Sequence, residues 1–206
     1  MPDSTLQPLP LDTLSDLELH AVTGEIVTHR GQRAVRLTER GEAHGGSPIA
    51  VIANTHFRDG IIEAEIAGVP HADALSFSRG FVGLAFRVQP GGSRYECFFL
   101  RPTNGRADDQ LRRNHATQYI SMPDHPWHRL RDEHPGVYES YVDLAPEVWI
   151  PVKIVVTGTR AQLYVHHAEQ PCLIVNDLKL GDTTGNIALW VGSGTDAYFT
   201  NLRITH

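Results

Sequence analysis

One hairpin determines how this chain folds: residues 80–101 read GFVGLAFRVQPGGSRYECFFLR. On both sides of the Pro-Gly-Gly-Ser turn, every second residue is apolar, which is typical of antiparallel strands that bury one face. A four-residue turn pairs Gln89 with Arg94 and sets the register of the residues on either side. We therefore expect two adjacent strands joined at this turn.

The register predicted from this turn places Arg87 opposite Glu96 on the face of the hairpin that points away from the core. Gly83 and Ala85 lie beside this pair on the same face, and their small size leaves space above the backbone. An ion pair next to open space could bind a hydroxylated ligand, or it could only stabilise the hairpin. The residues expected between two packed sheets are Leu84, Phe86 and Phe99.

Strand signals continue through most of the chain, with helical pieces expected only at 108–113 and 127–133. More than ten short strands joined by tight turns predict an all-β, two-sheet antiparallel sandwich or jelly roll. We expect one domain, 1–206, with 1–14 as an N-terminal arm and 102–136 as a long ordered loop over the sheet. The expected strands are 17–22, 25–30, 33–38, 49–53, 60–67, 81–88, 94–101, 117–121, 138–142, 148–157, 160–166, 172–175, 186–192 and 197–204.

Composition excludes several classes of function. The formal net charge is −6, so no basic surface for nucleic acid is expected, and no apolar run is long enough to cross a membrane. The N-terminus lacks a signal-peptide pattern, which predicts a cytoplasmic protein or the processed form of a secreted one. Cys97 and Cys172 are expected to be free thiols, with a disulfide as the alternative.

Five short motifs carry a resemblance to a known family. Together they resemble the concanavalin A-like jelly-roll domains grouped with 3-keto-disaccharide hydrolases and laminin-G-like modules, over residues 45–206. The resemblance implies two curved sheets whose concave side holds carbohydrate or a related glycoside, and this fold hosts both lectins and hydrolases. The motifs are FRDGIIE (57–63), GFVGLAFR (80–87), YE (95–96), GNIALW (185–190) and AYFTNL (197–202).

The sequence departs from the hydrolases of this fold in two places. Family-16 glucanases carry Glu-x-Asp-x-Glu on one strand, whereas Glu63-Ala64-Glu65 lacks the third carboxylate. A retaining mechanism that uses two carboxylates is therefore not indicated. The keto-disaccharide hydrolases often have YExQxxD, and Phe98 stands here at the position of the Gln.

The resemblance implies a carbohydrate-active protein similar to glycoside hydrolases, which binds a small glycoside on the concave sheet. The alternatives are a non-catalytic, lectin-like module and a purely structural domain. Glu96 and His115 are the candidates for acid–base catalysis. Donors for hydroxyl groups and aromatic faces for sugar stacking give the candidate ligand-binding residues. These are Arg87, Arg101, Asn114, Gln118, Trp127 and Trp190.

Histidines in the long loop suggest a metal site only weakly. His125 and His128 are three positions apart, but Pro126 interrupts any helix that would align them, and zinc needs three or four converging ligands. We therefore expect no metal and no organic cofactor, although a structural calcium ion held by loop oxygens stays open. The sequence gives no indication of an oligomeric state.

Overall fold

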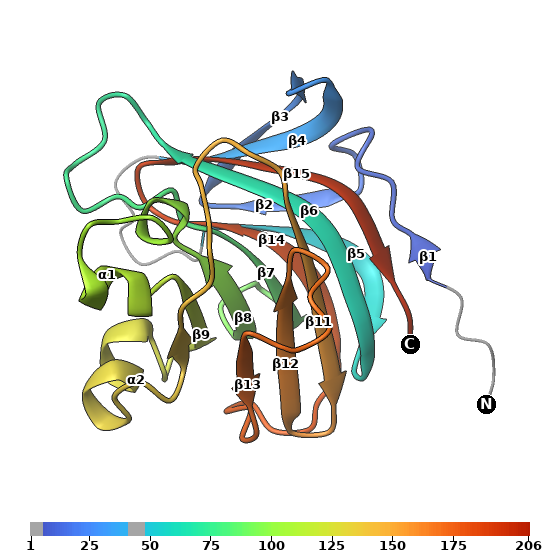
Figure 1. The fold of residues 1–206 in the computed structure, drawn as a ribbon. Helices are drawn as coiled ribbons and strands as arrows, with labels where there is room; N and C mark the ends of the chain where they lie inside the picture. The colour runs from blue at the N-terminus through green and yellow to red at the C-terminus, as the bar shows by residue number, and fades with distance from the viewer. Residues whose placement is uncertain (1–5, 41–47) are drawn as a thin grey trace.

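The computed structural model describes residues 6–40 and 48–206, which form two antiparallel sheets packed face to face (Figure 1). Sheet A contains β13 (Leu173–Val175), β12 (Arg160–Val165), β11 (Ile150–Thr157), β6 (Gly60–Pro70), β15 (Thr195–Ile204), β4 (Gln32–Glu39) and β3 (Val22–His29), in that order, with β1 (Gln7–Pro8) beside β15. Sheet B contains β10 (Glu139–Ser140), β9 (Thr117–Met122), β8 (Tyr95–Leu100), β7 (Val82–Val88), β14 (Gly185–Val191), β5 (Ile49–Phe57) and β2 (Leu17–His20).

The expected all-β sandwich is confirmed, and each expected strand has a counterpart within a few residues. The helical pieces are α1 (Gln110–Asn114) and α2 (Trp127–Glu133), preceded by the 3₁₀ turn η1 (Pro102–Asn104). Both helices lie beside β9, at one side of the molecule (Figure 1). No helix in the described part of the chain is long and apolar enough to cross a membrane.

The N-terminal arm adds a strand that the sequence did not predict. Gln7 pairs with Ile204, and the amide of Leu9 donates to the carbonyl of Leu202 at 2.9 Å, so this stretch runs antiparallel to β15. Leu11 is buried against the core. Residues 1–5, which belong to the expected arm, lie outside the described residues.

Segment 102–136 is more regular than a loop laid over the sheet. Its middle, β9, is a strand of sheet B that pairs with both β8 and β10. The pieces on either side, with α1 and α2, stand beside the same sheet. The segment therefore both extends sheet B and builds structure at its edge.

The core lies between the two sheets and follows the alternation of the strands. Along β6, Ile62 and Ile66 are buried whereas Glu63 and Glu65 are partly exposed, as the pattern predicts. Leu84 of β7 faces across to sheet A in the same way.

The predicted register of the hairpin is wrong by one residue along most of its length. The turn itself is as expected, because the Gln89 amide donates to the Arg94 carbonyl at 2.9 Å. Beyond the turn, however, Phe86 pairs with Glu96. Arg87 has a φ of 53°, so β7 contains a bulge at this point and accommodates one extra residue.

The bulge reverses the faces of β8 relative to the prediction. Phe99 lies opposite Gly83 on the outer face of sheet B, not between the sheets. Glu96 correspondingly points between the sheets instead of outward. Leu84 and Phe86 are buried as predicted, because the bulge follows them in the strand.

Arg87 is buried at the end of the sandwich, with a side chain that is 0% exposed. Its guanidinium donates to the carbonyl oxygens of Arg58 at 2.8 Å, Gly158 at 2.7 Å and Gly181 at 2.6 Å. These oxygens belong to the β5–β6 turn, the β11–β12 turn and the segment between β13 and β14. One side chain of sheet B therefore holds three separate connections in place. Its pKa is lowered by burial, partly offset by Asp59 and Asp182.

Replacing this side chain should destabilise the fold. We expect Arg87→Ala to lower the free energy of unfolding by about 3 kcal/mol or more, because each hydrogen bond from a charged donor contributes about 1.5–3 kcal/mol. Urea denaturation measures the loss. Arg94→Ala is the matched control in the same hairpin, since its side chain is 55% exposed, and it should change stability by less than about 0.5 kcal/mol. Equal effects of the two substitutions would contradict the role given to Arg87.

Candidate functional site

A cavity of about 440 Å³ opens on the outer face of sheet B, the face that points away from sheet A. Its floor is apolar and largely aromatic, with Phe81, Phe99, Ile120 and Trp190. The walls come from the β6–β7 connection, from the η1–α1 segment and from α2.

The floor and one wall are built from a single row of residues that crosses five strands. Trp190 of β14 pairs with Gly83, Gly83 with Phe99, Phe99 with Gln118, and Gln118 with Glu139 of β10. The Phe99 and Trp190 rings are stacked with centroids 4.7 Å apart. Gly83 permits this packing, because a Cβ there would lie 2.6 Å from the Phe99 Cβ. The row places aromatic faces and charged groups on one surface.

Arg101 continues the row at the end of β8 and is buried in the pocket wall. Its guanidinium lies 4.8 Å above the Phe99 ring and donates to Gln118 Oε1 at 3.2 Å and to the His115 carbonyl at 3.0 Å. Burial lowers its pKa to about 10, so the group still carries its charge at neutral pH. Gln118 itself is fully buried and donates to the carbonyl oxygens of Tyr119 and Tyr138. It therefore orients Arg101 from beneath the pocket.

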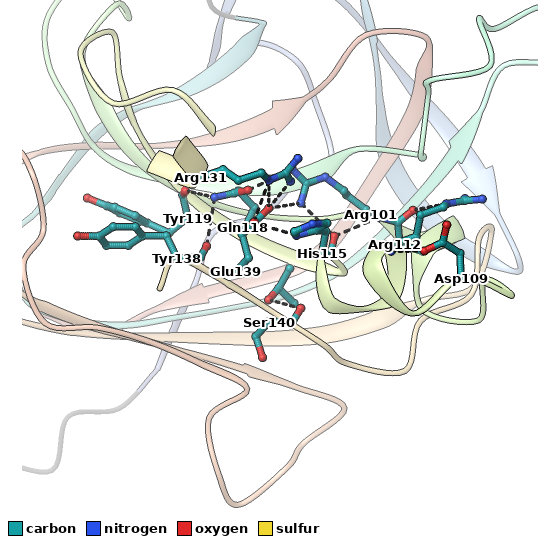
Figure 2. Close-up of polar contacts among 12 residues, drawn as sticks. Arg101, Asp109, Arg112, His115, Gln118, Tyr119, Arg131, Tyr138, Glu139 and Ser140 are labelled. Atoms are coloured by element: carbon teal, nitrogen blue, oxygen red, sulfur yellow. Dashed lines mark hydrogen bonds and ion pairs between the residues drawn. The ribbon is translucent and has the colours of Figure 1, made fainter. Parts of the chain in front are cut away.

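Figure 2 shows Glu139 at the centre of the polar contacts of this wall. Its side chain is only 2% exposed. Arg131 of α2 donates to it through Nε at 3.0 Å, and Arg101 Nη1 lies 3.5 Å away. The His115 Nδ1 lies 2.8 Å from Glu139 Oε2. One buried carboxylate thus joins two arginines and a histidine from three different segments.

His115 follows α1 and is mostly buried at the pocket wall. Burial is the largest influence on its imidazole and lowers the pKa below 6.5, while the charge of Glu139 acts in the opposite direction. The imidazole is therefore neutral at pH 7, and Nε2 is the ring nitrogen that does not face Glu139.

The remaining walls carry exposed aromatic rings and further arginines. Trp127, the first residue of α2, is 45% exposed, and the Arg131 guanidinium lies 4.8 Å from its ring. Across the cavity, Arg112 Nε donates to Asn104 Oδ1 at 3.4 Å. Arg79, from the β6–β7 connection, donates to the Ser78 carbonyl at 2.9 Å.

The structure brings together four of the predicted site residues: Arg101, His115, Trp127 and Trp190 all line this cavity. Asn114 is exposed on α1 and borders a neighbouring groove instead. The sequence did not indicate as site residues Phe77, Arg79, Phe81, Asn104, Arg112 and Arg131, which also line it. The alternation of β7 did place Phe81 on the outer face, which is the one signal that could have identified it.

The predicted Arg87–Glu96 ligand pair does not line the cavity. Glu96 is fully buried on the other side of sheet B, where Tyr119 donates its hydroxyl to Oε2 at 2.5 Å and the Leu180 amide donates to Oε1 at 2.7 Å. Burial raises the pKa of this carboxyl. The bulge at Arg87 is the physical reason, because it turns Glu96 inward and sends Arg87 to the end of the sandwich.

Comparisons with known proteins agree with this architecture. No protein-family model and no curated protein sequence matches the chain. Among solved structures, a protein of unknown function with a galectin-like fold from Bacillus subtilis superimposes with a TM-score of 0.62 at 11% identity, over 97% of this chain and 96% of that one. The carbohydrate-binding module CBM66 from the same organism gives 0.60 at 12% identity, over 93% and 98%.

A beta-glucanase from Bacillus licheniformis is similar over the whole chain and 94% of its own, with a TM-score of 0.51 at 14% identity. The fold is a concanavalin A-like jelly roll. In this jelly roll the cavity lies on the outer face of sheet B and not between the sheets.

Protonation of His115 should destabilise this jelly roll. An unfolded histidine has a pKa of about 6.5, and the folded value is lower, so the folded state binds fewer protons as the pH falls through this window. The stability that the neutral imidazole provides is fully present above pH 6.5 and is lost as the pH falls through the folded pKa. In denaturation between pH 7 and pH 5, we expect wild type to lose stability relative to His115→Asn. A stability difference between wild type and His115→Asn that does not change with pH would contradict the lowered pKa of His115.

Proposed function

We propose that this protein binds carbohydrate in the cavity on the outer face of sheet B. The observation that carries the proposal is the stacked pair of Phe99 and Trp190 beneath a ring of guanidinium groups. Aromatic faces pack against the apolar C–H surface of a pyranose, and guanidinium N–H groups donate to its hydroxyl oxygens. The similar structures titled as a carbohydrate-binding module and a beta-glucanase support the same class of ligand.

Binding without hydrolysis fits the lining better than a two-carboxylate mechanism. Glycoside hydrolysis usually needs two carboxyl groups on opposite sides of the scissile bond. Among the described residues, no Asp or Glu lines the cavity. The nearest candidate, Glu139, is buried behind Arg101 and Arg131 and is occupied by them. A lectin-like role is therefore the first proposal.

A second candidate function is acid–base catalysis by His115. The neutral imidazole lines the cavity, and its Nδ1 lies 2.8 Å from the Glu139 carboxylate, whose charge favours the protonated form. If this candidate is right, His115→Gln should bind ligand with little change but should not turn it over. Product analysis by chromatography after prolonged incubation distinguishes it from binding alone.

Trp127 provides the most direct test of the binding site. Because its ring is exposed at the rim, Trp127→Ala should weaken saccharide binding by about 0.5–1.5 kcal/mol, the contribution typical of an aromatic face. The melting temperature should change little. A thermal-shift screen of oligosaccharides finds the ligand, and titration calorimetry measures both proteins with it.

Tyr164→Ala is the matched control, because Tyr164 lines a separate cavity on sheet A with Lys153 and Glu63. Binding should be unaffected by this change. Loss of binding in Tyr164→Ala, with Trp127→Ala unchanged, would move the site to sheet A. Absence of binding to any saccharide would refute the proposed function.

A further inference from the structure

The charge of the cavity is unusual for this chain. The protein as a whole has a formal net charge of −6, yet the ionisable residues that line the cavity are Arg79, Arg101, Arg112, Arg131 and a neutral His115. Four guanidinium groups therefore face one space of about 440 Å³ with an aromatic floor.

Two of these arginines share a single carboxylate. Arg101 and Arg131 both contact Glu139, which neutralises one of their two charges. Glu139 is buried behind these two arginines, and its negative charge is offset by theirs. Counting this carboxylate against the four guanidinium groups leaves an excess of three positive charges.

The other two arginines have no acidic partner. Within residues 6–40 and 48–206, no carboxylate oxygen lies within 4.0 Å of a guanidinium nitrogen of Arg79 or Arg112. Their guanidinium groups donate to neutral acceptors, Arg79 to the carbonyl oxygens of Ser76 and Ser78 and Arg112 to Asn104 Oδ1. The Asp109 carboxylate caps α1 by accepting from the Arg112 backbone amide, and it does not line the cavity.

Several exposed or half-buried arginines outside the cavity are each paired with a carboxylate: Arg36 with Asp196, Arg58 with Asp182, Arg106 with Asp143, and Arg129 with Glu133. By contrast, burial and the nearby charge of Arg112 lower the pKa of Arg79, which means that the protonated group is held at a cost. An anion in the cavity would offset this cost.

We infer that the ligand is an anionic saccharide, whose carboxylate or sulfate group binds at Arg79 and Arg112 while a sugar ring packs on Trp190 and Phe99. The inference rests on the proposed function and adds the substrate class. Guanidinium groups bind the oxygens of carboxylate and sulfate groups with paired, charge-assisted hydrogen bonds. A neutral sugar would leave the excess charge of the cavity uncompensated.

The test compares ligands that differ only in charge. Trigalacturonic acid and its methyl ester share every sugar contact, as do a sulfated galactan oligosaccharide and its desulfated form. We expect one of the two charged ligands to bind at least about tenfold tighter than its neutral counterpart, which corresponds to about 1.4 kcal/mol. This preference should shrink as sodium chloride is raised, because salt screens exposed charges. A preference within the galacturonic acid pair identifies the bound group as a carboxylate, and a preference within the galactan pair identifies it as a sulfate.

Variants assign the preference to the unpaired arginines. Arg112→Gln and Arg79→Gln should each reduce the charged-to-neutral ratio by about tenfold, because the charged ligand loses more affinity than the neutral one. Arg113→Gln is the matched control, since it removes the same charge from the next position of α1. Arg113 stacks on Tyr141 and does not line the cavity, so the ratio should be unchanged.

Each remaining outcome has a definite meaning. Equal binding of the charged and neutral members of both pairs would overturn the inference and leave the proposed function standing. Equal loss in Arg113→Gln and Arg112→Gln would overturn the assignment to the cavity. If free sulfate or citrate binds while none of the saccharides does, both the saccharide ligand and the proposed function are overturned.

Discussion

The buried guanidinium of Arg87 is the interaction on which the rest of this structure depends. It comes from sheet B and donates to backbone oxygens of three connections, which fixes the β5–β6 and β11–β12 turns at one end of the sandwich. A buried arginine must use its donors, because an unsatisfied charged group inside a protein is costly. The bulge with φ of 53° directs the side chain to those oxygens, so the strain at one residue is offset by several hydrogen bonds.

The same bulge positions the candidate site. By shifting the register by one residue, it places Phe99 over Gly83 and Trp190 beside Phe99 on the outer face. Arg101 follows two residues later on that face and lies above the Phe99 ring. Stability at the end of the sandwich and geometry of the cavity are therefore consequences of one backbone irregularity.

The cavity combines an aromatic floor with an excess of positive charge. Its arginines are partly buried, and two of them have no carboxylate partner among the described residues, although the chain carries more acidic than basic residues. Glu139 contacts both inner arginines and neutralises one of their two charges, which makes a wall of Arg101, Arg131 and His115. The outer pair, Arg79 and Arg112, is left for an external anion. The floor then selects for a ligand with an apolar face.

Alternation along the strands was enough to predict the sandwich, nearly all of its strands and the position of α2, because side-chain period is a local property. It also put Trp190 and Phe81 on the outer face. The Arg87 bulge was not predictable, since a bulge costs local pairing and is compensated only by oxygens from turns distant in sequence. For this reason the predicted pairing of Arg87 with Glu96 is wrong. Glu96 points inward, and the carboxylate beside Arg101 is that of Glu139. The sequence by itself determined the jelly roll; the tertiary structure decided which arginines share a cavity, because contacts between distant strands and loops set where each charge is held.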